Sequence, residues 1–231
     1  MRGSQKAFLA ALVVAMAAFA ASCGADAQPP SPTPASISFP KPAVDNPFAP
    51  ANGRETAVIS GGCFWGIQAV YEHTKGVISA TSGYTGGTAN TAHYEVVSTG
   101  GTGHAESVQI VYNPAQITYG QILMIFFSVA HNPTELNKQG PDWGKQYRSS
   151  IFYRNDEQKK IAKAYIAQLD AAKYYPQKIV TVVVPLNEFF QAEGYHQDYL
   201  KHNTSNPYIV INDLPKIEHL KKQFPELYRE Y

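Results

Sequence analysis

The chain has 231 residues, with 19 lysines and arginines against 18 aspartates and glutamates, so its formal net charge is +1. Charged residues make up 16% of the chain and hydrophobic residues 44%, a composition too apolar for a disordered protein. The near-neutral charge provides no basic face for phosphates, so we expect no nucleic-acid partner. Two cysteines exclude a disulfide-rich scaffold and a zinc site with four cysteine ligands.

The first residues have the pattern of an export signal. Two basic residues precede an uninterrupted apolar run from Ala7 to Ala21, which is too short to span a bilayer. The residues around Cys23 resemble a bacterial lipoprotein box, with residues 1–22 as the signal peptide and Cys23 as the lipid attachment site. Cleavage after Ala27, at an A-x-A site, is the alternative and would release the protein without a lipid. Either way we expect export to a bacterial cell envelope or periplasm, and the scarcity of cysteine favours the lipid anchor.

Prolines mark the next segment, because residues 28–53 contain eight of the chain's 16. This composition is typical of an extended, semi-rigid spacer. We therefore predict a Pro-rich tether over residues 23–53 and a folded domain over residues 54–208. A helical extension is expected over residues 209–231, with solvated lysines such as Lys216.

Within the domain, β-branched runs alternate with amphipathic segments. In chain order, the pattern predicts strands over 55–60, 77–84, 105–112, 149–154 and 179–185, and helices over 63–73, 119–131, 156–173, 196–202 and 214–231. The alternation favours an α+β fold, a compact two-layer α/β sandwich around a mixed, ferredoxin-like sheet. The connections over 85–103 and 131–147 are unusually long, which is typical of functional loops.

Cys63 is the first candidate for chemistry. It follows two glycines and opens a predicted helix, where free N–H groups and the helix dipole lower the pKa of a thiol. Phe64 and Trp65 come directly after it, and two large rings at a helix start are typical of a pocket lining. A buried cysteine that acts as a small hydrophobe is the alternative, and the pattern alone leaves both open.

Glu106 is the second candidate. Alternation along residues 105–112 places it on the same strand face as Val108 and Ile110, which is the apolar face. Lost hydration would raise its pKa, so that the carboxyl holds a proton near neutral pH. The alternative is a strand-end glutamate that bends into water, and the residues by themselves favour that alternative.

A family resemblance adds to this reading. The segment Gly61-Gly62-Cys63-Phe64-Trp65-Gly66 resembles the signature of the peptide methionine sulfoxide reductases of the A type. Six further segments resemble that family's motifs in the same order, and the resemblance covers residues 56–208. These six segments begin at Ser82, Tyr94, Thr102, His131, Gln146 and Ala192.

The resemblance implies an activity and a set of roles. The implied activity is reduction of methionine-(S)-S-oxide, in proteins and as the free amino acid, as repair after oxidative damage. Cys63 would be the nucleophile that attacks the sulfoxide sulfur, and Glu106 the acid that protonates the oxygen. The residues implied in substrate binding are Phe64, Trp65, Tyr94, Asp142 and Tyr147. No metal and no organic cofactor is implied.

The thiol chemistry needs a reductant from outside the chain. Many relatives carry a C-terminal resolving cysteine, whereas no cysteine follows Cys63 here. We therefore expect the sulfenic acid on Cys63 to be reduced by an external thiol, such as that of a thioredoxin-like protein. The expected partners are that reductant and oxidised methionine-containing proteins. We expect a monomer that meets the membrane only through the N-terminal lipid.

Three residues differ from the family's usual pattern. Asn132, Pro141 and Phe190 stand where the family usually has aspartate, asparagine and tyrosine, and these departures concern substrate geometry.

An envelope thiol hydrolase with a Cys63–His pair is the alternative enzyme. A non-catalytic lipoprotein that binds exposed methionines is a third interpretation.

Overall fold

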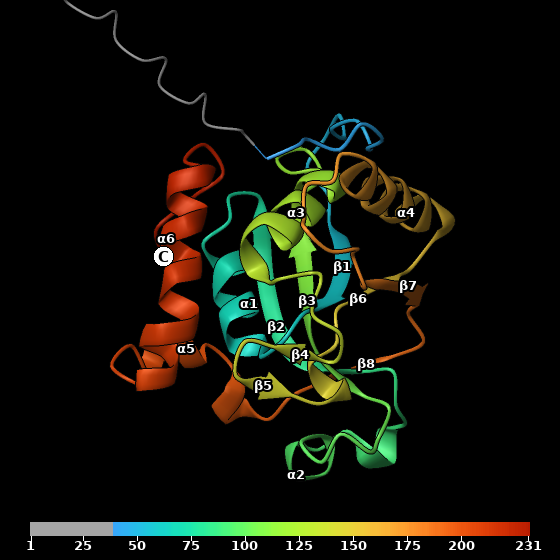
Figure 1. Ribbon diagram of the computed structural model, residues 1–231. Helices are drawn as coiled ribbons and strands as arrows, with labels where there is room; N and C mark the ends of the chain where they lie inside the picture. The colour runs from blue at the N-terminus through green and yellow to red at the C-terminus, as the bar shows by residue number, and fades with distance from the viewer. Residues whose placement is uncertain (1–38) are drawn as a thin grey trace, which may run out of the picture. The chain divides into compact units, whose positions relative to one another are not determined.

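The computed structural model describes residues 39–231 (Figure 1). The predicted signal peptide, Cys23 and the alternative cleavage site after Ala27 lie outside the described residues, as do residues 23–38 of the predicted tether. From residue 39 onward, no helix is both long enough and apolar enough to cross a membrane.

A six-stranded sheet, in the order β7-β6-β1-β3-β2-β8, organises the domain. Its strands are β1 (Glu55–Ser60), β2 (Val77–Thr85), β3 (Ala105–Tyr112), β6 (Ser150–Tyr153), β7 (Val182–Pro185) and β8 (Phe189–Gln191). Neighbouring strands are antiparallel except β6 and β7, which are parallel, so the sheet is mixed. A separate hairpin pairs β4 (Lys138–Gln139) with β5 (Asp142–Trp143).

The four central strands have the ferredoxin-like arrangement. In chain order, β1, α1 (Phe64–Glu72), β2, β3, α3 (Tyr119–Ile125) and β6 form a βαββαβ unit, and in the sheet the strands lie in the order β6-β1-β3-β2. Helices α1 and α3 lie over one face of the sheet (Figure 1). The predicted two-layer α+β fold is confirmed. The other helices are α2 (Tyr94–Val97), α4 (Asp156–Ala171), α5 (Tyr199–His202) and α6 (Leu214–Gln223).

Local sequence explains where the helices begin. Thr118 accepts a hydrogen bond from the Gln121 N–H at 3.1 Å, and the Gln121 side chain accepts one from the Thr118 N–H at 3.0 Å, a capping box that starts α3. Asn155 caps α4 in a similar way. Helix α1 differs, because Cys63 occupies its N-cap position and makes no capping bond with its side chain. The Cys63 thiol therefore takes no part in capping the helix.

Several predicted elements differ in extent. Helix α3 ends at Ile125 and continues as a π-helical turn over Phe126–Ala130, and the C-terminal helix ends at Gln223 rather than 231. The loop over 85–103 contains α2, and the loop over 131–147 contains the β4–β5 hairpin. These elements have two to four residues, too few to produce a periodic pattern.

Residues 39–53, which the sequence assigned to the tether, belong to the same compact unit as the domain. Phe39 is buried, and its ring packs edge-on against Tyr174 at 4.6 Å. Asp45 accepts hydrogen bonds from the Thr118 hydroxyl and, at 2.8 Å, from the Gly120 N–H at the start of α3. The many prolines indicated an extended segment, but apolar and acidic residues between them attach residues 39–53 to the domain.

The C-terminal segment, predicted as a helical extension, packs against the domain. Helix α6 lies beside α1 (Figure 1), with Ile217 and Leu220 buried in the main core. Asp213, directly before α6, is fully buried. This segment therefore belongs to the domain, and it reaches the neighbourhood of Cys63.

Candidate active site

Cys63 lies in the turn between β1 and α1. Its exposed fraction is 9%, and it is a free thiol. Gly62 has a φ of 106°, a left-handed conformation that favours glycine. A Cβ on Gly62 would lie 2.6 Å from the side chain of Gln139, so the glycine also makes room for the β4–β5 hairpin. The two glycines thus allow a sharp turn that presents the sulfur beside this hairpin.

Glu106 lies on β3, with its side chain on the buried face. Its Oε2 accepts a hydrogen bond from the Phe64 N–H at 3.1 Å. Burial raises the pKa of Glu106 to about 8, and Asp142 adds to this effect, whereas the Phe64 N–H opposes it. The carboxyl is therefore mostly protonated at neutral pH, as the alternation of the strand indicated.

The prediction of a lowered pKa for Cys63 is wrong. Burial raises the pKa of the thiol well above its usual value, and negative charge on Glu106 or Asp213 raises it further. The Trp65 N–H and the Lys216 ammonium lower the pKa by less. The helix N-terminus supplies one hydrogen bond, which does not compensate for the lost hydration of the sulfur. In the resting protein, Cys63 is a neutral thiol.

Phe64 and Trp65 occupy different environments. Phe64 is almost fully buried, and its ring lies 5.0 Å from the His196 ring. Trp65 is half-buried and stacks flat on Tyr199, with ring centroids 3.7 Å apart. Its indole N–H donates to Nδ1 of His196 at 3.1 Å. Trp65 therefore has the more exposed apolar surface beside Cys63.

Tyr94 and Tyr147 lie close enough to the two reactive groups to feel their charges. Burial raises the pKa of both phenols, and negative charge on Glu106 and on Cys63 raises it further. Both hydroxyls therefore stay protonated and can donate hydrogen bonds. Tyr94 is anchored through its backbone N–H, which donates to Glu193 at 2.9 Å.

Asp142, on β5, is the remaining predicted binding residue. It accepts a hydrogen bond from the hydroxyl of Tyr208 at 2.5 Å. Burial raises the pKa of Asp142, and the bond from Tyr208 opposes that shift. The structure thus brings together all seven residues that the sequence assigned to catalysis and substrate binding, from five separate segments of the chain.

A cavity of about 90 Å³ opens beside Cys63. The turn Gly140–Pro141 forms part of its wall, and the side chains that line it are Cys63, Gln139, Asp142, Tyr208, Asn212 and Lys216. Three of these, Tyr208, Asn212 and Lys216, were not predicted as site residues, because the resemblance to the family's motifs ended at residue 208.

A buried ion pair lies at the edge of this cavity. The Lys216 ammonium lies 2.9 Å from Oδ1 of Asp213. The pair approaches the first turn of α1, where a Cβ on Gly66 would lie 2.0 Å from that oxygen and 2.8 Å from the ammonium. Because Gly66, the last residue of the Cys63 motif, has no side chain, it leaves space for the ion pair.

The three departures from the family pattern have distinct surroundings. Asn132 accepts hydrogen bonds from the Thr134 N–H and hydroxyl at 3.1 and 2.8 Å. Phe190 pairs with Tyr84 across β8 and β2, so it belongs to the sheet edge. Pro141 lies in the wall of the cavity that Cys63 also lines.

The histidines do not form a dyad with the thiol. His131 contacts the Phe126 carbonyl with Nδ1 at 2.9 Å and the Ser149 hydroxyl with Nε2 at 2.7 Å. Burial lowers the pKa of His131 to about 3, so this ring is neutral. Within residues 39–231, no hydrogen bond joins a histidine to Cys63 and no group of three metal-ligating side chains occurs.

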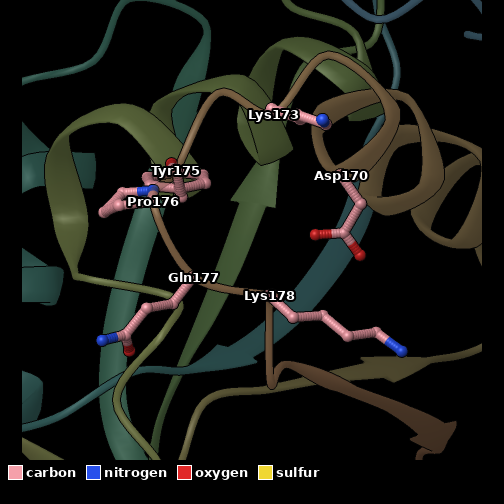
Figure 2. Close-up of a pocket in the computed structure, with 6 residues that line it drawn as sticks. All are labelled: Asp170, Lys173, Tyr175, Pro176, Gln177 and Lys178. Atoms are coloured by element: carbon pink, nitrogen blue, oxygen red, sulfur yellow. The ribbon is translucent and has the colours of Figure 1, made fainter.

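A wider depression of about 560 Å³ lies at the end of α4, away from Cys63. Figure 2 shows its side chains pointing in different directions rather than toward a common centre. Asp170 accepts a hydrogen bond from the Ile179 N–H at 3.1 Å, and the Tyr175 hydroxyl donates to the Phe127 carbonyl. These groups stabilise the turn after α4, and the depression is not a second candidate site.

Known proteins are similar to this chain in sequence and in fold. A relative from Mesorhizobium japonicum, named peptide methionine sulfoxide reductase MsrA 2, is 59% identical over 81% of this chain and 95% of its own length. A protein of the same name from Synechocystis is 49% identical over 84% and 92% of the two chains.

Solved structures agree with the sequence relatives. Reduced Mxr1 from Saccharomyces cerevisiae matches with a TM-score of 0.62 and 33% identity, over 71% of this chain and 92% of that one. Methionine sulfoxide reductase A of Corynebacterium diphtheriae matches with a TM-score of 0.58 and 34% identity, over 67% and 77%. The sequence model of the family called peptide methionine sulfoxide reductase matches residues 55–228, which include the segment around Lys216. The buried thiol, the protonated acid beside it and these similarities lead to one conclusion: the chain belongs to the peptide methionine sulfoxide reductase family.

Proposed function

We propose that Cys63 and Glu106 carry out the reaction of this peptide-methionine (S)-S-oxide reductase, which reduces oxidised methionine and so repairs proteins. The observation that carries the proposal is the 3.1 Å hydrogen bond from the Phe64 N–H to Glu106. It holds a protonated acid against the residue that follows the thiol. Protonation of the sulfoxide oxygen makes the substrate sulfur electrophilic, so the reaction needs this acid next to its nucleophile.

The two raised pKa values favour a coupled proton transfer. Glu106 gives its proton to the sulfoxide oxygen while the Cys63 sulfur attacks the substrate sulfur. The thiol proton, held by the raised pKa of Cys63, is then accepted by the vacated carboxylate. The hydroxyl group then passes from the substrate sulfur to the Cys63 sulfur as the bond between the two sulfurs breaks, and the electron pair of that bond stays on the substrate sulfur. Methionine sulfoxide is thus reduced by two electrons to methionine, and the thiol is oxidised to a sulfenic acid.

The surrounding residues bind the substrate. Tyr94 and Tyr147 donate hydrogen bonds to the sulfoxide oxygen, because their raised pKa values keep both hydroxyls protonated. The half-buried ring of Trp65 packs against the S-methyl group. Asp142, fixed by Tyr208, forms the polar side of the same pocket.

An external thiol completes the cycle. The attack of one thiol on the sulfenic acid releases water and forms a mixed disulfide, and a second thiol restores Cys63. A thioredoxin-like protein supplies both thiols. The support is the sequence, since Cys63 is the last cysteine of the chain. Mass spectrometry of enzyme oxidised by substrate tests this step, and an intramolecular disulfide would contradict it.

Export and anchoring form a second part of the proposal. Residues 1–22 act as a lipoprotein signal peptide, and Cys23 carries the lipid in a bacterial envelope. The support is the apolar run from Ala7 to Ala21 and the lipoprotein-like residues that follow it. Mass spectrometry of the mature N-terminus tests this, because a chain that begins at Gln28 without lipid would contradict it.

The activity itself is tested with the two epimers of methionine sulfoxide and dithiothreitol as the reductant. We expect methionine from the S epimer only, and no turnover by Cys63→Ser. Ester hydrolysis without sulfoxide reduction would instead support a thiol hydrolase, which the structure does not favour because His131 is bonded elsewhere. Binding of methionine-containing peptides without turnover would support a non-catalytic role.

A further inference from the structure

The ion pair between Asp213 and Lys216 is placed as part of the site rather than as part of the surface. Asp213 is fully buried, and the Lys216 side chain is 18% exposed. Lysine side chains usually extend into water, so a lysine held on a buried carboxylate is unusual. Because Lys216 lines the cavity beside Cys63, its charge faces the thiol.

Among the described residues, Lys216 is the only hydrogen-bond partner of the Asp213 side chain. Its Oδ1 is bonded to Lys216, and its Oδ2 is buried without a hydrogen bond among the described residues. A buried carboxylate with an unpaired oxygen is costly. The fold therefore keeps at this point an ion pair that costs desolvation energy.

The charged and titratable groups around Cys63 come from several elements. Those that interact with the thiol or line its cavity are Glu106, Asp142, Asp213, Lys216, Tyr94, Tyr147 and Tyr208. Within this described set, Lys216 is the only cation. The other members are carboxyl groups and phenols, and negative charge on Glu106 or Asp213 opposes negative charge on the sulfur.

We propose that Lys216 is a positioning residue that promotes attack by Cys63, because Asp213 holds its ammonium where negative charge develops on the sulfur. The inference rests on the proposed function only in taking Cys63 as the reacting thiol. It assigns helix α6 a part in the chemistry as well as in packing.

The test measures the rate of Cys63 alkylation by iodoacetamide across pH, in the absence of any sulfoxide. Lys216→Gln removes the charge and keeps a hydrogen-bond donor for Asp213, whereas Lys216→Arg keeps the charge. We expect the pH profile of Lys216→Gln to move to higher pH by up to about one unit, which is up to about tenfold slower alkylation near neutrality. Lys216→Arg should retain most of the rate. Lys216→Met repeats the test if the glutamine variant does not fold.

Lys221→Met is the matched control, because Lys221 lies on the same helix and pairs with the exposed Glu230. We expect it to leave the alkylation profile unchanged. An unchanged profile in Lys216→Gln, or an equal shift in Lys216→Arg, would overturn the inference. Alkylation does not depend on reductase activity, so a shifted profile in a protein without reductase activity would overturn the proposed function and leave this inference standing.

Discussion

Glu106 is fastened to the main chain of Phe64 by a hydrogen bond of 3.1 Å, so the acid and the nucleophile belong to one rigid unit. The bond joins β3 to the first residue of α1, and the thiol lies one residue earlier. Small movements of the strand therefore carry the acid and the thiol together. This coupling accounts for how a carboxyl with a raised pKa stays aligned with a sulfur that is itself nine-tenths buried.

Replacement of the acid should abolish most of the activity. We expect Glu106→Gln to lower kcat/KM by about 10²- to 10⁴-fold, the usual contribution of general acid catalysis. The exposed Glu95, on the nearby helix α2, provides the control, since Glu95→Gln should leave kcat/KM within twofold or so. Steady-state kinetics with S-sulfoxide and dithiothreitol measure both. Full activity in Glu106→Gln would remove the acid from the mechanism.

The pH dependence of activity follows from the same group. Since the pKa of Glu106 is about 8, the protonated form is lost as the pH rises through that value. We expect kcat/KM to fall above about pH 8 after correction for the ionisation of dithiothreitol. A rate that keeps increasing with pH beyond this point would show that the reaction needs no proton from Glu106.

The raised pKa also makes stability depend on pH. The folded state keeps a proton on Glu106 up to about pH 8, whereas a glutamate in the unfolded chain releases it near 4.5. The stability due to this proton is fully present below about pH 4.5 and is lost as the pH rises toward 8. Glutamine does not titrate, so Glu106→Gln does not lose stability in this way. The free energy of unfolding of the variant minus that of the natural protein should therefore increase from pH 5 to pH 8. Urea unfolding at the two pH values measures it, and a constant difference would contradict the buried, protonated carboxyl.

Gly66 should be intolerant of a side chain. A methyl group there meets Asp213 and Lys216 at less than contact distance, so Gly66→Ala should lower the free energy of unfolding by about 1–3 kcal/mol. Gly194→Ala is the matched control, because a Cβ at Gly194 meets nothing within 4 Å. Urea unfolding compares the two. If both variants lose the same stability, the close approach of α6 to α1 is not the cause.

The segment before β1 should contribute to stability. Asp45→Ala removes the acceptor for the Gly120 N–H at the start of α3, and we expect a loss of about 0.5–2 kcal/mol, the usual cost of a lost helix cap. Lys41→Ala, at an exposed neighbour in the same segment, should cost less than about 0.5 kcal/mol. Thermal or urea unfolding gives both values. Equal stability of the two variants would mean that the segment is not held by Asp45.

The fold and the site differ in how far sequence could predict them. Long periodic segments such as β3 and α4 were predicted within two residues, because burial of one face imposes a repeat. The direction in which the pKa of Cys63 is shifted was predicted wrongly, because the pattern shows that a helix begins there but not how deeply the turn is buried. Lys216 and Tyr208 were missed, because their role depends on α6 lying beside α1, a contact between distant parts of the chain.

The most direct test of the account follows the oxygen atom. One turnover with methionine-S-sulfoxide that carries a heavy-oxygen label, in the absence of any thiol, should leave the label on Cys63 as a sulfenic acid. Peptide mass spectrometry of the unmodified enzyme reads the label as added mass on Cys63. A dimedone-type probe, which expels the oxygen as water, identifies the sulfenic acid in a parallel sample. We predict the labelled sulfenic acid on Cys63 in proportion to the methionine formed. Methionine formed while Cys63 stays unmodified, or label found on another residue, would contradict the account.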